Sequence, residues 1–113
     1  MKLYPNVTYI FIIWLATVLL IAYFGFSTLP HSGKFDNNFW ASLSNWDGGH
    51  YLGIAESGYS EKFQYAFFPL YPLTIKILNQ ITQNHLLAAI LVSVGSTFLG
   101  LHLLYKLVAV DFD

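Results

Sequence analysis

The chain has 113 residues, of which 56% are hydrophobic and only 10% are charged. An ordinary soluble domain carries about 25% charged residues, so this chain cannot cover a soluble surface and lipid must take that role. The net charge is −1 and the sequence contains no Arg and no Cys. This composition excludes the basic surface of a nucleic-acid-binding protein, disulfides and thiolate metal sites.

The first predicted element is an uncharged apolar run from Val7 to Phe26. About 20 such residues cross the hydrocarbon core of a membrane as a helix. The apolar region of a cleaved signal peptide has only about 7–15 residues, and no A-x-A-like cleavage site follows this run. We therefore predict a retained transmembrane helix at 7–26.

The region after this run is predicted to be a loop that contains short helices. Residues 27–45 are polar and rich in turn-forming residues, and Asp47–Ser57 is predicted as a short helix that ends at Gly58. Two prolines in Tyr65–Pro72 oppose a regular helix there. The amphipathic pattern of Leu73–Ile81 predicts a short helix at the membrane surface.

A second uncharged run predicts another transmembrane helix at 86–106. Its small residues Ser93, Ser96 and Gly100 recur at helical spacing, which is typical of membrane helices that pack closely against others. Lysines flank both spans and also lie between them, so their distribution leaves the orientation open. Since the chain stops soon after this run, we expect it to be truncated and to lack further helices.

The loop concentrates chemically active side chains, namely Trp46, Asp47, His50, Tyr51, Glu56, Tyr59 and Glu61. Asp47 and His50 are three positions apart, which makes them neighbours on one face of a helix. A carboxylate beside an imidazole near lipid can have its proton affinity tuned. Such a carboxylate can accept a proton from a sugar hydroxyl as a general base.

Each of these residues also has a structural interpretation. Asp47 is a good N-cap for the short helix, and His50 could be an exposed histidine at the membrane interface. Glu56 and Glu61 could be solvated charges, and the aromatic residues could form an interfacial belt. No spacing predicts a metal site, because the four histidines lie too far apart in sequence: His31, His50, His85 and His102.

Two stretches resemble the signature of the PIG-V family of membrane mannosyltransferases, which belongs to the GT-C superfamily. Asn45–Tyr59 reads N-W-D-G-G-H-Y-L-G-I-A-E-S-G-Y, and Ala66–Pro72 reads A-F-F-P-L-Y-P. The similar family pattern is W-D-x-x-H-[FY]-L-x-I-A-x-x-G-Y, a short spacer and A-F-F-P. The resemblance covers nearly all of this chain, but only the beginning of the much longer family members.

This resemblance implies an all-α membrane fold, the N-terminal part of a multi-pass GT-C enzyme. Residues 27–85 would form an extracytoplasmic loop with juxtamembrane helices, and 1–6 and 107–113 would be cytoplasmic. The donor would be a polyprenyl- or dolichyl-phosphate sugar, most simply mannose, and the acceptor a lipid or glycan. Asp47 would be the catalytic base of an inverting transfer. The remaining transmembrane helices of the full-length protein would complete the site.

The resemblance implies further roles at the same site. His50 would orient Asp47 or contact the donor phosphate. The other expected substrate-binding residues are Trp46, Tyr51, Glu56, Tyr59, Glu61, Phe67 and Phe68. No cofactor is expected, and a divalent metal is left open.

The sequence F-P-L-Y-P favours a prokaryotic cell membrane, with the ER membrane expected for a eukaryotic chain. The alternatives are a non-catalytic two-span or assembly protein and a small transport subunit, for which His102 is the one hint.

Overall fold

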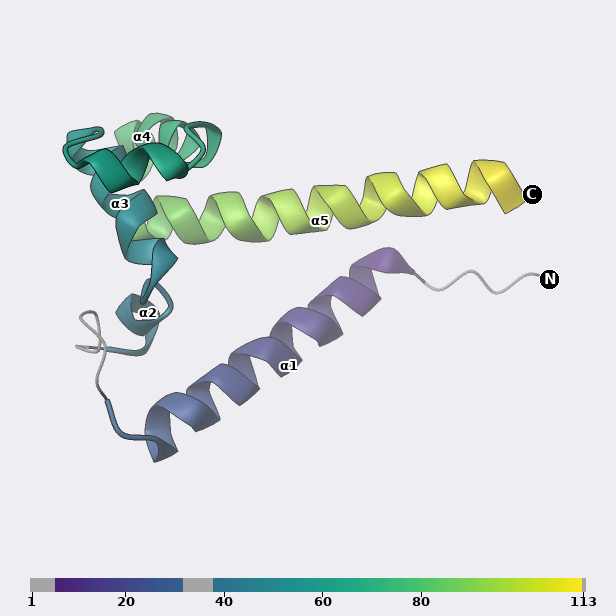
Figure 1. Cartoon of the computed structure of the whole chain (residues 1–113). Helices are drawn as coiled ribbons and strands as arrows, with labels where there is room; N and C mark the ends of the chain where they lie inside the picture. The colour runs from purple at the N-terminus through teal and green to yellow at the C-terminus, as the bar shows by residue number, and fades with distance from the viewer. Residues whose placement is uncertain (1–5, 32–37, 113) are drawn as a thin grey trace. The chain divides into compact units, whose positions relative to one another are not determined.

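The computed structural model describes residues 6–31 and 38–112. Regular structure in these residues is helical throughout, with no strand among them (Figure 1). The chain divides into two compact units, Met1–Leu29 with Val94–Asp113 and Pro30–Ser93. We call these the helix-pair unit and the loop unit. The predicted all-α fold is confirmed.

Helix α1 spans Val7–Thr28. Asn6 is its N-cap, and the side-chain oxygen of Asn6 accepts a hydrogen bond from the Thr8 backbone at 3.0 Å. The helix continues two residues beyond the predicted end at Phe26. The hydroxyls of Ser27 and Thr28 donate to backbone carbonyls one turn earlier, each at 2.8 Å. Such bonds let hydroxyl groups remain in a helix where no water satisfies them, so the expected start of the loop at residue 27 was wrong.

Helix α5 spans His85–Phe112 and is longer than the predicted span. Lys106 does not end it, because Lys is a good helix former. His102 therefore lies well inside the helix rather than near its end. Its Nε2 lies 3.4 Å from the Thr8 hydroxyl, and Phe98 packs edge-on against Phe11 at 5.1 Å in the same unit. His102 thus has a structural role between α1 and α5. This weakens the alternative that the chain is a small transport subunit.

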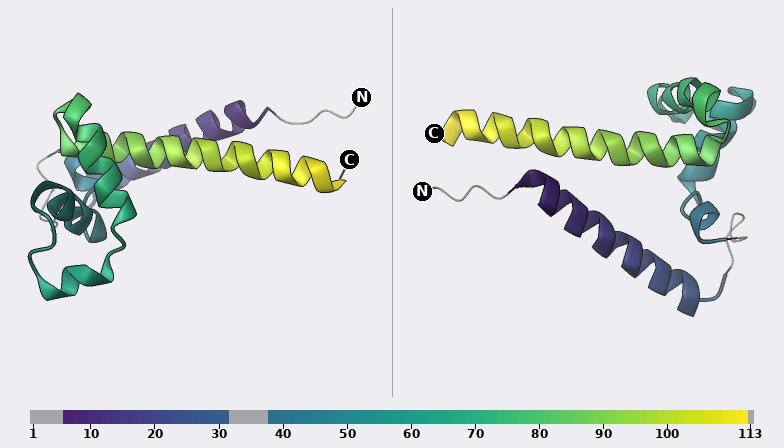
Figure 2. Two further views of the ribbon diagram at one scale, coloured as in Figure 1. Left: turned by 90° about the horizontal axis from the view of Figure 1, so that it is seen from above. Right: turned by 180° about the vertical axis from the view of Figure 1, so that it is seen from behind.

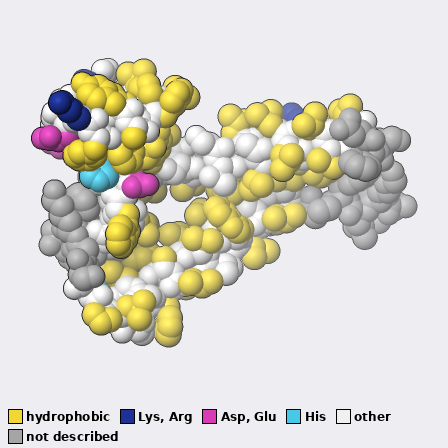
Figure 3. All heavy atoms as spheres, in the orientation of Figure 1, with side chains coloured by type: hydrophobic (Ala, Val, Ile, Leu, Met, Phe, Trp, Pro, Cys, Tyr) yellow, Lys and Arg dark blue, Asp and Glu magenta, His cyan; other side chains and the backbone are white. Residues whose placement is uncertain are grey.

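Few apolar side chains of either long helix are buried within this chain, and Figure 3 shows hydrophobic side chains exposed along both helices on one face. Only 6% of the apolar window of α1 and 11% of that of α5 are buried. A core helix of a soluble protein would be largely buried, whereas a helix that is hydrophobic all round and uncovered needs lipid or other membrane helices around it. We therefore assign α1 and α5 as two membrane-spanning helices.

The loop unit contains four shorter elements. They are α2 (Phe39–Ser42), α3 (Asp47–Ser57), the 3-10 helix η1 (Lys62–Ala66) and α4 (Leu70–Thr82). The structure confirms the predicted bounds of α3, and its last turn closes at Gly58 with a φ of 79°, a conformation that favours glycine. Helix α2 lies inside the region predicted as loop, where the Asn38 side chain caps it by accepting from the Ala41 backbone at 2.9 Å.

Helix α4 begins at Leu70, three residues before the predicted start at Leu73. The prediction was wrong because Pro72 falls in the first turn of the helix, where a backbone N–H has no partner within the helix. Proline is therefore tolerated at this position. The earlier start adds Tyr71 to the helix, and its hydroxyl lies 2.7 Å from the Ser93 hydroxyl of α5.

Helices α3 and α4 pack on each other and on the first turns of α5 (Figure 2). Their shared core consists of Ala55, Ile75, Ala88 and Ala89, with Leu52, Tyr71 and Leu78 packed against it. The opposite face of α4 exposes Leu70, Leu73, Ile77 and Ile81. The placement of that outer face against the membrane surface stays a prediction.

Candidate functional site

The polar end of the site is the start of α3. Asp47 is the first residue of this helix and its side chain is exposed, while the N-cap position belongs to Trp46. The alternative in which Asp47 is the N-cap was therefore wrong by one position. A carboxylate in the first turn is favoured by the partial positive charge of the helix N-terminus. In the described part of the chain, no side chain forms an ion pair or hydrogen bond with this carboxylate.

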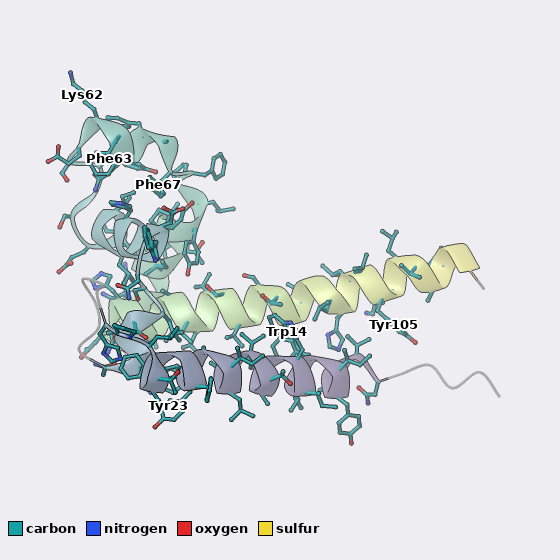
Figure 4. The ribbon with its side chains drawn as sticks, turned by 60° about the horizontal axis from the view of Figure 1, so that its bottom comes forward. Trp14, Tyr23, Lys62, Phe63, Phe67 and Tyr105 are labelled. Carbon is teal, nitrogen blue, oxygen red and sulfur yellow. The ribbon has the colours of Figure 1, made fainter. Side chains whose placement is uncertain are left out.

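His50 lies one turn further along α3 and is half-buried. Its ring contacts Phe63 at 5.2 Å and Phe67 at 5.1 Å between ring centroids. Figure 4 shows both phenylalanines on the η1 side of the loop unit, with Lys62 directed away from it. The interpretation of His50 as an exposed interfacial histidine was therefore wrong. The rings of Phe63 and Phe67 hold the imidazole on one side of α3. Of the two predicted catalytic residues, Asp47 is therefore the one with an exposed side chain.

Phe67 joins the aromatic residues of the site. Its ring packs edge-on against Tyr51 at 5.1 Å, and its backbone carbonyl accepts a hydrogen bond from the Tyr59 hydroxyl at 2.8 Å. Tyr51 in turn packs edge-on against Tyr71 at 5.1 Å. The structure thus brings four of the predicted site residues together in one cluster: His50, Tyr51, Tyr59 and Phe67.

The other predicted site residues lie on the surface. Trp46 is 92% exposed and Phe68 is 73% exposed, and the side chains of Glu56 and Glu61 are exposed as well. Among the described residues, none of these four forms a ring contact or a hydrogen bond with His50. The rings of Trp46 and Phe68 are therefore available to a ligand, because the described residues leave most of their surface uncovered.

Sequence reasoning missed three residues that shape the site. Phe63 and Tyr71 supply rings to the cluster, and Gln64 is buried, with its side-chain oxygen accepting the backbone N–H groups of Ser60 at 2.7 Å and Glu61 at 3.0 Å. The spacing between Glu61 and Gln64 is that of an N-cap and the third helical residue, which is the signal that could have found this turn. No sequence signal pairs Phe63 with His50.

Within residues 6–31 and 38–112, no three His, Asp or Glu side chains come together in a way that could hold a metal ion.

Two apolar helices that can span a membrane, joined by a helical loop with an exposed carboxylate on the first turn of α3, define the class, a helical membrane protein. The sequence profile of the family "Mannosyltransferase (PIG-V)" matches residues 25–112, and the chain belongs to this family. The resemblance found in the loop motifs is thereby confirmed.

The chain is also similar to the human protein GPI alpha-1,6-mannosyltransferase 2, with 37% identity over 59 residues. The match covers 48% of this chain and 12% of the human protein, so the chain corresponds to a small part of that relative. A human relative gives no support to the expected prokaryotic membrane. No solved structure matches the chain.

Proposed function

We propose that this chain carries the catalytic loop of a membrane mannosyltransferase that uses a polyprenyl- or dolichyl-phosphate sugar as donor. The acceptor is a hydroxyl group of a lipid or glycan. The observation that carries this proposal is the exposed Asp47 carboxylate on the first turn of α3, in a loop between two spans of a PIG-V family chain. The name of the human relative supports mannose as the sugar and a GPI-type acceptor.

Asp47 acts as the general base in a single displacement. The acceptor hydroxyl gives its proton to the carboxylate as its oxygen attacks the anomeric carbon of the donor. The new glycosidic bond forms as the bond between that carbon and the phosphate oxygen breaks, and the lipid phosphate leaves. Attack from the face opposite the phosphate inverts the configuration. A positioned base of this kind contributes about 10²–10⁴-fold to a reaction rate.

The aromatic cluster holds His50 beside this carboxylate. Its half-buried imidazole, packed against Phe63 and Phe67, has little freedom to rotate and so is suited to orient Asp47 or to contact the donor phosphate. Tyr51, Tyr59 and Phe67 form the wall behind it.

The exposed side chains complete the binding surface. The rings of Trp46 and Phe68 are free to lie along the sugar or the prenyl chain. The carboxylates of Glu56 and Glu61 can accept hydrogen bonds from sugar hydroxyl groups. Membrane lipid and the remaining helices of a GT-C fold cover the apolar faces of α1 and α5, and supply the other parts of the donor and acceptor sites.

The direct test of this function is sugar transfer in membranes that contain the full-length protein. Labelled polyprenyl-phosphate mannose is supplied as donor, and the appearance of label in a lipid or glycan product is measured. We expect transfer above that of membranes without the protein. A non-catalytic two-span or assembly protein would give no increase with any polyprenyl-phosphate hexose.

The loop should lie on the extracytoplasmic side of the membrane, and this can be tested with cysteines introduced into these 113 residues, which contain no Cys, in a full-length protein without other reactive cysteines. Lys62 and Lys106 are both exposed and lie outside the proposed site. In sealed membranes of known orientation, an impermeant maleimide added to the extracytoplasmic face should label Lys62→Cys but not Lys106→Cys. The reverse pattern would place Asp47 in the cytosol and contradict the proposed topology.

A further inference from the structure

The backbone at Trp46 has an unusual conformation, with φ 62° and ψ −129°. Among the described residues, the only other non-glycine residue with positive φ is Gln83, which has φ 53° and ψ 24° at the end of α4. Gln83 thus lies in the ordinary left-handed region that commonly ends helices. Trp46 lies in the mirror image of the extended region, which glycine populates readily and a bulky residue avoids.

The side chain of Trp46 does not explain this conformation. The indole is 92% exposed, and within the described part of the chain no ring packs against it. A strained backbone persists only where its surroundings determine it, and such residues cluster at active sites and ligand clamps.

The surroundings of Trp46 are indeed fixed on both sides. Before it, the buried Ser44 donates its backbone N–H to the Ala41 carbonyl at 2.9 Å. After it, the Trp46 carbonyl accepts from the Gly49 backbone at 3.2 Å. Hydrogen-bonded turns therefore lie on both sides of Trp46, and α3 begins at the next residue, Asp47.

We propose that Trp46 is a positioning residue of the transfer site, and that its backbone conformation sets the direction in which the Asp47 carboxylate leaves the start of α3. This proposal rests on the proposed function. The two parts of the residue then do different things. The backbone aims Asp47 and affects the chemical step, whereas the exposed indole is available to the donor and affects its binding.

The test replaces Trp46 with Gly and with Val in the full-length protein. Both variants lose the indole, but Gly adopts positive φ without strain, whereas β-branched Val resists it. We expect the donor KM to rise by similar factors in both variants. The kcat per folded molecule should be at least about tenfold higher for Trp46→Gly than for Trp46→Val. If the size of the side chain decided kcat, Trp46→Val would be the faster variant, because Val is closer to Trp in volume and hydrophobicity.

Thermal unfolding of the same variants in detergent provides a second measurement that does not depend on activity. The unfolding midpoint should be higher for Trp46→Gly than for Trp46→Val. If Val prevents folding, Trp46→Ala replaces it, since any Cβ retains the strain. Equal midpoints would overturn the assignment of strain. A difference in midpoint with equal kcat would show a merely structural role and would overturn positioning. Absence of transfer by the wild-type protein, with the midpoints ordered as expected, would reject the proposed function and the positioning role but not the strain.

Discussion

Replacing Asp47 with Asn in the full-length protein is expected to abolish sugar transfer, with kcat lowered by about 10²–10⁴-fold or more. The amide has nearly the same shape as the carboxylate but cannot accept the proton of the acceptor hydroxyl. Because the side chain is exposed and has no ion pair or hydrogen bond among the described residues, the fold loses no contact when the charge is removed. The measurement is the rate of label transfer from polyprenyl-phosphate mannose in membranes.

Two controls separate catalysis from folding. Asp47→Asn should insert into the membrane and unfold close to the wild-type temperature, since it loses only the attraction of the carboxylate to the helix N-terminus, about 0.3–1 kcal/mol. Lys76→Gln removes an exposed charge from α4, outside the proposed site, and should leave transfer unchanged. Wild-type rates in Asp47→Asn would remove Asp47 from the mechanism, and the search for the base would then move to the other exposed carboxylates of the loop unit.

The long elements could be predicted because local signals decide them. A long uncharged apolar run favours a helix in lipid, since a helix satisfies its backbone groups within the segment itself. The bounds of α3 were equally accessible, because a positive φ at its end favours Gly58. The ends of α1 and α5 were missed because charge and polarity, which mark the edge of the hydrocarbon core, do not mark the end of a helix.

The site was predicted unevenly for a related reason. The motif identified the residues on α3, but it could not show that His50 packs against Phe63, since nothing local relates two rings on separate elements. The alternative interpretation, from residue preference, placed Asp47 at the cap position, because no propensity rule assigns a tryptophan with positive φ to that place. The positive φ of Trp46 conflicts with the local preference of a bulky residue, and Trp46 directly precedes the proposed base. Such conflicts are expected where function overrides local stability.

The stability of the loop unit should depend on Ile75 more than on any exposed residue of α4. Ile75 is fully buried, and its side chain joins α4 to Ala55 of α3 and to the alanines at the start of α5. Its replacement by Ala removes this apolar contact and leaves a cavity, which costs about 2–5 kcal/mol. This is a large part of the 5–15 kcal/mol that stabilises a typical domain.

Ile77→Ala is the matched control, since it makes the same chemical change on the same helix at a residue that is 58% exposed. Hydrogen exchange of the α3 backbone amides measures both variants. We expect exchange to accelerate roughly thirty-fold or more in Ile75→Ala, because each 1.4 kcal/mol corresponds to about a factor of ten. It should change little in Ile77→Ala. If both variants accelerated exchange equally, the core would not lie between α3 and α4. If neither did, α3 and the Asp47 that begins it would be held in place by contacts other than this core.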